Sequence, residues 1–270
     1  MTVMIAASNR DIAAMNILEK IQSRLSFIES GRSFDGFPIL RNRNLMIVRT
    51  ESDSIYTSGL DKVPDVDSII FASRHSSSSG QSTLTVHTPG NPLIEAKYGG
   101  SPESLAISDP NKMKAALITM RSEVLDKNLS YQVSLEATHH GPTEIERPVV
   151  FVEIGSGPKQ WEDIKAGEIV AKAILQAAQD HSAFRTAVGF GGGHYAPKFT
   201  DLVLEGELSI GHIFPKYCIR ELSSKVISLA FERTRDQCTL AVIDWKGIRG
   251  TDRERLLGIL SKLGIETYRI

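Results

Sequence analysis

The stretch Ser134–Lys159, SLEATHHGPTEIERPVVFVEIGSGPK, decides how the rest of the chain is expected to fold. A short apolar run brings the adjacent His139 and His140 into a Gly-Pro turn. A second apolar run, 149–154, ends in a glycine-rich loop, after which a helical pattern begins. Short apolar runs bounded by turn residues and followed by a helix are typical of strands in an α/β sheet. The stretch therefore predicts two strands, with two imidazoles at the turn that follows the first.

Strands and helices alternate on both sides of this stretch. The alternation predicts an α/β fold, a three-layer sandwich in which helices cover both faces of a mixed, mostly parallel sheet. The expected strands are 3–7, 45–48, 68–72, 83–87, 131–137, 149–154, 186–190, 209–214, 239–244 and 266–270, and the expected helices are 11–25, 109–127, 161–179, 219–233 and 252–263.

The composition sets bounds on the class of protein. The chain has 270 residues, of which 41% are hydrophobic and 23% charged, as in soluble globular proteins. We expect one domain, residues 1–270, with the irregular region 73–105 as a lid or subdomain. The formal net charge of −1 indicates no global basic field for nucleic acid, although a local basic patch would not alter the total.

Two further features concern the cellular compartment. Cys218 and Cys238 are the only cysteines and form no Cys-x-x-Cys pair, which argues against a disulfide scaffold and a thiolate zinc site. The apolar start is too short for a signal peptide, and no apolar run approaches the ~18 residues of a membrane span. We therefore expect a cytoplasmic protein without a membrane segment.

The adjacent His139 and His140 are the sharpest chemical signal. Neighbouring side chains on a strand point to opposite faces, so both reach one site only if the chain turns there. The alternative is one histidine in the core and the other on the surface. Imidazole and carboxylate together suit a zinc ion, and the expected carboxylate partners are Glu136, Glu144 and Glu153.

Three other segments follow predicted strands. The run Gly191, Gly192, Gly193, His194 and Tyr195 allows the backbone to approach a ligand closely, or is a tight turn with an incidental histidine.

The loop with Gly155, Gly157 and Lys159 would hold an anion at a helix start, or is a plain connection. His75 is a ligand or a nucleotide contact, or a surface residue, and His87, His181 and His212 are weaker candidates. Ligands gather at the carboxyl ends of strands in such sheets, so we expect the segments 134–159 and 191–195 to meet in one site.

Several of these segments resemble one family. THHGPTEIERPVVFVEIGS (138–156), GFGGGHYAPKFT (189–200) and the region 73–91 are similar to the archaeal and plant type of D-aminoacyl-tRNA deacylase. The resemblance extends over essentially the whole chain. It implies a phosphorylase/hydrolase-like fold, a monomer, bound Zn²⁺, and hydrolysis of the ester that joins a D-amino acid to the acceptor end of tRNA, releasing both.

The resemblance leaves the roles of individual residues as hypotheses. His139, His140 and His194, with Glu153 or Glu144, are expected to bind zinc or to position the attacking water. The remaining expected substrate contacts are His75, Gly155, Gly157, Lys159, Gly191, Gly192, Gly193 and Tyr195, with the amides of 191–193 stabilising the oxyanion.

Two alternatives remain open. A zinc-dependent peptidase or amidase on the same fold would turn over small peptides without tRNA. A non-catalytic RNA- or nucleotide-binding module would bind tRNA ends and hydrolyse nothing, but binding alone does not require several imidazoles in one place.

Overall fold

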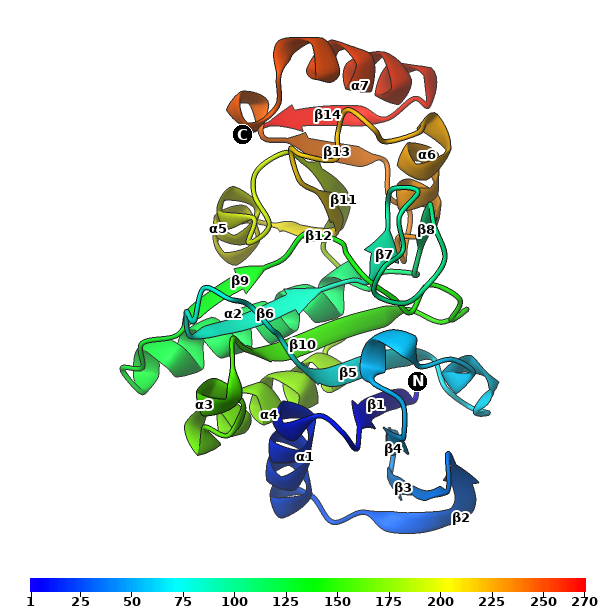
Figure 1. The fold of residues 1–270 in the computed structure, drawn as a ribbon, viewed down its shortest axis with the longest axis vertical. Helices are drawn as coiled ribbons and strands as arrows, with labels where there is room; N and C mark the ends of the chain where they lie inside the picture. The colour runs from blue at the N-terminus through cyan, green and yellow to red at the C-terminus, as the bar shows by residue number, and fades with distance from the viewer.

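The strands form two large sheets in the computed structural model, which describes residues 1–270 (Figure 1). The larger sheet has the strand order β2-β3-β4-β1-β5-β10-β6-β9 and the smaller has the order β12-β11-β13-β14. The strands are β1 Val3–Ser8, β2 Ile28–Phe34, β3 Phe37–Asn42, β4 Leu45–Thr50, β5 Ser68–Arg74, β6 Thr83–His87, β7 Gly90–Asn91, β8 Ser104–Leu105, β9 Gln132–Leu135, β10 Val149–Gly155, β11 Arg185–Phe190, β12 Leu208–Phe214, β13 Leu240–Ile243 and β14 Glu266–Arg269.

The larger sheet is mixed. β1, β4, β5 and β10 run parallel to one another, whereas β6 pairs antiparallel with β10 and parallel with β9. The smaller sheet is parallel throughout. The predicted α/β fold with a mixed, mostly parallel sheet is confirmed, but the sequence did not predict that the last four strands form a sheet of their own.

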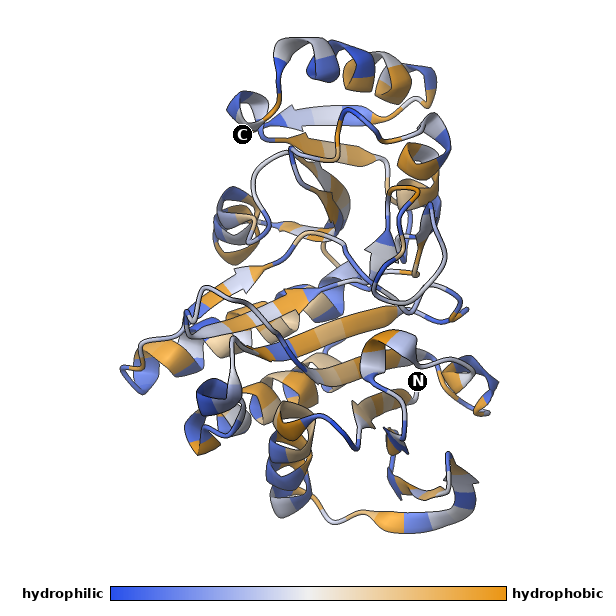
Figure 2. Ribbon diagram, viewed as in Figure 1, coloured by the Kyte–Doolittle hydropathy of each residue, from blue (hydrophilic) through white to orange (hydrophobic).

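Helices cover the sheets in a way that the burial pattern explains. The helices are α1 Ile12–Arg24, α2 Pro110–Asp126, α3 Pro158–Trp161, α4 Ile164–Gln179, α5 Pro197–Glu205, α6 Ser224–Glu232 and α7 Gly250–Lys262. The apolar sides of α1, α2 and α4 share one core with one face of the larger sheet. The smaller sheet lies between α5 on one face and α6 and α7 on the other. Figure 2 shows the hydrophobic residues concentrated in the central strands and on the inward sides of these helices.

Helix starts follow their capping residues. The side chain of Asp109 accepts a hydrogen bond from the Lys112 amide at 3.3 Å, and Pro110 occupies the first turn, as the sequence predicted. Asp11 caps α1 in the same way, through the Ala14 amide at 3.1 Å. None of the helices has the length and hydrophobicity that a membrane crossing requires.

The region 73–105 is divided between two structures. Residues 83–87 form β6, an inner strand of the larger sheet. Residues 90–105 contain the small β7-β8 sheet. The Gly90 amide donates to the carbonyl of His140 at 2.7 Å, so this segment lies directly against the histidine turn.

Candidate active site

The site lies on the face of the larger sheet opposite α1, α2 and α4. Residues alternate between the two faces of a strand. Val150, Val152 and Ile154 of β10 face the helices, so Glu153 faces the other way. By the same alternation, Thr85 and His87 of β6 face away from the helices. So do Ser134 of β9 and Glu136 directly after it. Three strands therefore present one histidine and two carboxylates to the same side.

Two buried carboxylates organise the cluster. Glu136 Oε1 lies 3.1 Å from His75 Nδ1, and Glu136 Oε2 lies 3.2 Å from His194 Nε2. The same oxygen is 3.7 Å from His139 Nε2. Glu153 Oε2 lies 3.6 Å from His87 Nε2 and 3.7 Å from His75 Nδ1. The two carboxylates thus connect four imidazoles that come from distant parts of the chain.

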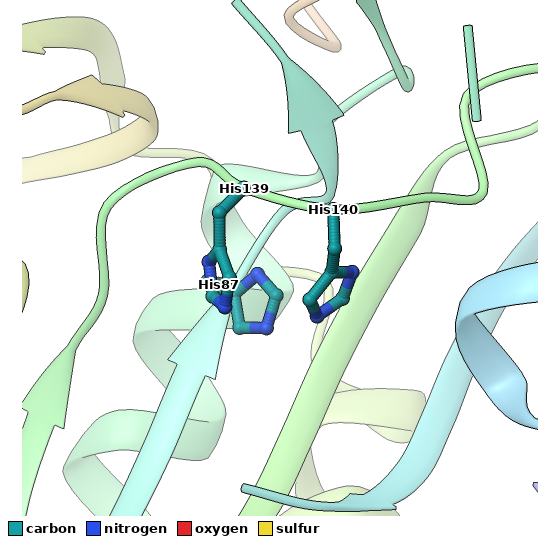
Figure 3. A group of neighbouring side chains, drawn as sticks. All are labelled: His87, His139 and His140. Atoms are coloured by element: carbon teal, nitrogen blue, oxygen red, sulfur yellow. The ribbon is translucent and has the colours of Figure 1, made fainter. Parts of the chain in front are cut away.

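The turn after β9 brings His139 and His140 to one side. His140 has a positive φ of 47°, and the ring centroids of the two histidines are 4.4 Å apart. Figure 3 shows both rings directed toward His87, whose ring centroid lies 4.3 Å from that of His139. The chain therefore makes the turn that two adjacent histidines need in order to share a site.

Backbone carbonyls orient these two imidazoles. His139 Nδ1 lies 2.8 Å from the Ala137 carbonyl oxygen, and His140 Nδ1 lies 2.6 Å from the Gly141 carbonyl oxygen. Because a carbonyl only accepts, each Nδ1 carries the proton and each neutral ring keeps an unprotonated Nε2. Such nitrogens accept a proton or coordinate a metal ion.

His194 comes from the smaller sheet. Its carbonyl accepts a hydrogen bond from the Ala137 amide at 2.8 Å, which fixes the loop after β11 against the histidine turn. Gly191 and Gly192 adopt positive φ values of 108° and 73°, which glycine reaches without steric cost. A β-carbon at 191 would lie 3.0 Å from Asp244 and Ile248. The glycines therefore shape the loop that delivers His194.

The histidines of the cluster differ in the direction of their pKa shifts. Burial lowers the pKa of His75, but Glu153 and Glu136 outweigh this effect and raise it to about 10. Burial raises the pKa of Glu153, but His75 and His87 bring it well below its ordinary value.

The pKa values of His139 and His140 shift in the opposite direction. Burial and the adjacent His87 hold the pKa of His139 well below its ordinary value and lower that of His140 to about 3. His75 is therefore cationic at neutral pH, and His139 and His140 are neutral.

Several buried polar atoms in the cluster have no hydrogen-bond partner of good geometry. They are both ring nitrogens of His87 and both carboxylate oxygens of Glu136. Buried polar atoms are nearly always paired, so unpaired ones call for an explanation such as an ion. Three groups have their ligand atoms within 4.8 Å of one another: His87 with His139 and His140, His75 with Glu136 and His194, and His87 with Glu136 and Glu153. Nitrogen and carboxylate donors of this kind suit zinc.

Two cavities meet at the histidine turn. The larger, of about 450 Å³, is lined by His75, His194, Glu153 and polar residues at the start of α1, after β4 and at the end of β5. The smaller, of about 230 Å³, is lined by β7, by the loop that follows it and by Pro215, Tyr217 and Cys218. His139, His140 and Tyr98 line both cavities. A substrate with two parts can therefore lie across the histidines.

The structure brings together some of the expected residues. His75, His139, His140, His194 and Glu153 all line the larger cavity. Tyr195 joins them indirectly, because its hydroxyl lies 3.0 Å from His75 Nε2.

Other expected residues lie elsewhere. The carboxylate of Glu144 bonds to Ser101 at 2.9 Å and to the Thr143 amide at 3.1 Å, and it lines neither cavity. Gly157 precedes the single turn of α3, and Lys159 is exposed on it.

The glycines occupy structural positions. The Gly191 amide donates to Phe214 at 2.8 Å, so it is not free to stabilise an oxyanion. Gly192 and Gly193 line a separate cavity of about 190 Å³. Gly155 packs against His75, since a β-carbon there would lie 2.7 Å from Cδ2 of that ring.

Two residues at the centre of the cluster carry only a weak signal in the sequence. His87 was a weaker candidate, yet its ring lies against His139 and His140. The signal was present in TLTVH, where Thr83, Thr85 and His87 alternate with two apolar residues and so share a face. Glu136 was one of three candidate carboxylates, and the structure places it between three histidines.

Fold and site together define a class of protein. A histidine–carboxylate centre between two cavities of an α/β protein is the arrangement of a hydrolase that activates water. A family model described as D-aminoacyl-tRNA deacylase matches residues 62–268. The chain belongs to the D-aminoacyl-tRNA deacylase family.

Individual relatives agree with this assignment. The D-aminoacyl-tRNA deacylase of Thermococcus kodakarensis is 42% identical over 96% of both chains, and that of Pyrococcus furiosus is 41% identical over 95% of both. The one from Methanosarcina acetivorans is 38% identical over 99% of this chain and 92% of its own. A crystal structure described as a conserved protein of unknown function is 32% identical, with a TM-score of 0.92 over 99% of this chain and 95% of that one.

Proposed function

We propose that this chain hydrolyses the ester bond of D-aminoacyl-tRNA and releases the free D-amino acid and tRNA. The observation that carries the proposal is the cluster of histidines and two buried carboxylates, of which His139 and His140 line both cavities. Membership of the deacylase family supports this substrate. An aminoacyl ester is already activated, so a positioned water, a base and a stabilised oxyanion are sufficient for its hydrolysis.

The residues of the cluster divide this work among them. A water molecule attacks the carbonyl carbon of the ester, and the bond from that carbon to the ribose oxygen breaks. An unprotonated Nε2 of His139 or His140, where it does not hold a metal ion, accepts a proton of the water and passes it to the ribose oxygen as that oxygen leaves. The cationic His75 lies within hydrogen-bonding distance of the Tyr195 hydroxyl, so that hydroxyl can donate its own proton toward the developing oxyanion.

The same residues fit a zinc ion. The ring nitrogens of His87 and the carboxylate oxygens of Glu136 are buried and make no hydrogen bond of good geometry, and a nearby cation would satisfy them. We propose His87, His139 and His140 as the ligand group. His75 lies in another such group with Glu136 and His194, but a cationic imidazole has no nitrogen lone pair for a metal ion. Compared with the ligands expected from the sequence, His139, His140, Glu153 and His194, the proposed group adds His87 and leaves out Glu153 and His194. Zinc supplies Lewis-acid activation of water when it is bound.

We also propose that the chain acts as a monomer, in the cytoplasm and on the acceptor end of tRNA. The family resemblance implies a monomer. The substrate is charged tRNA, which supports a cytoplasmic location. The net charge of −1 favours a grip on the acceptor end rather than on a long stretch of phosphate backbone.

A pair of variants tests the function and the site together. Release of D-amino acid from D-aminoacyl-tRNA is measured for wild type, Glu136→Gln and Glu144→Gln. Glu136→Gln is expected to lower the rate by roughly 10²-fold or more, because it removes a charge that faces three histidines. Glu144→Gln is the matched control, since that carboxylate bonds only to Ser101 and Thr143. Equal rates for the two variants would contradict the site, and an inactive wild type would contradict the function.

A further inference from the structure

We infer that the two cavities beside the histidine turn hold opposite ends of the aminoacyl ester. The larger cavity takes the terminal nucleotide of tRNA, and the smaller takes the side chain of the amino acid. This inference rests on the proposed function and adds a specificity-determining surface to it, with Tyr217 and Leu93 as its main residues.

The first step follows from the shape of the substrate. An ester has its acyl group and its alcohol group on opposite sides of the reacting carbon. His139 and His140 line both cavities, so an ester that reacts at these imidazoles has one group directed into each cavity. The remaining question is which group enters which cavity.

The larger cavity has the chemistry of a nucleotide site. Its volume is about 450 Å³, and its lining includes Asp11, Asp53, Arg74 and the hydroxyls of Ser54, Ser73 and Ser76. Carboxylates and hydroxyls accept hydrogen bonds from the hydroxyl groups of a ribose. A guanidinium pairs with phosphate or stacks on the face of a base.

The setting of Arg74 adds to this argument. Its guanidinium lies 3.6 Å from Asp53 and 5.7 Å from the centre of the Trp161 ring, and its side chain is one-third exposed. The group is thus held in place while one side stays open to a ligand.

The smaller cavity has the chemistry of a side-chain pocket. Pro92, Leu93, Pro215, Cys218 and the rings of Tyr98 and Tyr217 line much of it. The charged residues at the cavity, Glu95 and Lys97, pair with each other at 2.7 Å. Tyr98 and Tyr217 are 65% and 63% exposed, so their rings offer apolar area that an amino-acid side chain would cover.

A change in substrate selectivity tests the assignment. The value of kcat/KM is measured with D-tyrosyl-tRNA and with D-alanyl-tRNA, which differ only in the side chain and in the tRNA that carries it. Tyr217→Ala and Leu93→Ala are expected to lower the ratio of the tyrosyl to the alanyl value by ~10-fold, because only the larger side chain uses the pocket. Arg74→Ala is expected to lower both values by the same factor.

Controls keep the outcomes distinct. Tyr217 is exposed, so its truncation leaves no cavity in the core, and Tyr217→Phe is expected to keep the wild-type ratio. Tyr268→Ala is the matched control, because that tyrosine is 49% exposed on β14 of the smaller sheet and lines neither cavity. An unchanged ratio in Tyr217→Ala and Leu93→Ala, or a changed ratio in Arg74→Ala, overturns the assignment while the proposed function stands. A wild type that hydrolyses neither substrate overturns both.

Discussion

Gly155 is the residue at which a single methyl group tests the geometry of the site. It is the last residue of β10, and a β-carbon there would lie 2.7 Å from Cδ2 of His75 and 2.7 Å from Oγ1 of Thr83. Ordinary contact between carbon atoms is about 3.5–4.0 Å, so Gly155→Ala requires a displacement of roughly 1 Å. Thr83 is buried on β6, an inner strand, so the ring of His75 is expected to move.

The size of the effect follows from that displacement. A shift of about 1 Å in a catalytic group costs about 10²-fold in rate, or about 2.7 kcal/mol in the activation barrier. The same overpacking is expected to lower the free energy of unfolding by about 1–3 kcal/mol. We therefore expect Gly155→Ala to fold, with a reduced melting temperature, and to lose about 99% of its deacylase activity.

The assay compares this variant with one from the same loop. Gly157→Ala adds the same methyl group, but its nearest neighbour is Gln160 Oε1 at 3.7 Å and its φ of −155° is ordinary extended backbone. Deacylation rate and thermal unfolding are measured for both. The reasoning is wrong if Gly155→Ala keeps the wild-type rate, or if Gly157→Ala loses as much activity.

Three other predictions follow from the structure. Burial lowers the pKa of His212 from 6.5 to about 4, so this residue is expected to reduce the free energy of unfolding by about 3 kcal/mol as the pH falls from 6.5 to 4. Denaturant unfolding of His212→Gln should show a smaller decrease over that pH range, and a decrease equal to that of the wild type would refute this. Bound zinc, measured by elemental analysis, is expected to fall in His87→Ala but not in the exposed control His181→Ala; equal metal content in both would count against the ligand set. Asp163→Ala is expected to lower the free energy of unfolding by about 1–2 kcal/mol. Asp163 caps α4 through the Lys165 amide at 2.8 Å and accepts a hydrogen bond from the Tyr131 hydroxyl at 2.8 Å. A melting temperature equal to that of the wild type would contradict this.

Sequence pattern predicted the elements that bury apolar residues. β5 and β10 read as short apolar runs, and both lie inside the larger sheet with nearly every residue buried. The hairpin of β2 and β3 was not predicted, because it lies at the sheet edge and most of its residues are partly or fully exposed. α5 was also missed: it has nine residues and begins at Pro197, directly after a glycine-rich loop. Periodicity therefore predicts buried elements better than edge or short ones.

The sequence predicted which residues form the site better than it predicted how they are arranged. His139, His140 and His194 follow predicted strands, so their convergence could be expected. The contact between His194 and Glu136 depends on how the smaller sheet packs against the larger one, which no local pattern encodes.

Glu144 shows the converse case. It lies near the histidines in sequence and was therefore a candidate, but its carboxylate bonds to the loop that contains Ser101. Nearness along the chain is a poor guide where the backbone turns sharply.

The most direct test of the central claim is single-turnover hydrolysis of D- and L-tyrosyl-tRNA, prepared on the same tRNA and mixed with the same enzyme preparation. The account predicts release of D-tyrosine at a rate far above that of spontaneous hydrolysis, with the L-ester left intact. Spontaneous rates for both esters, or equal enzymatic rates for both, would contradict it.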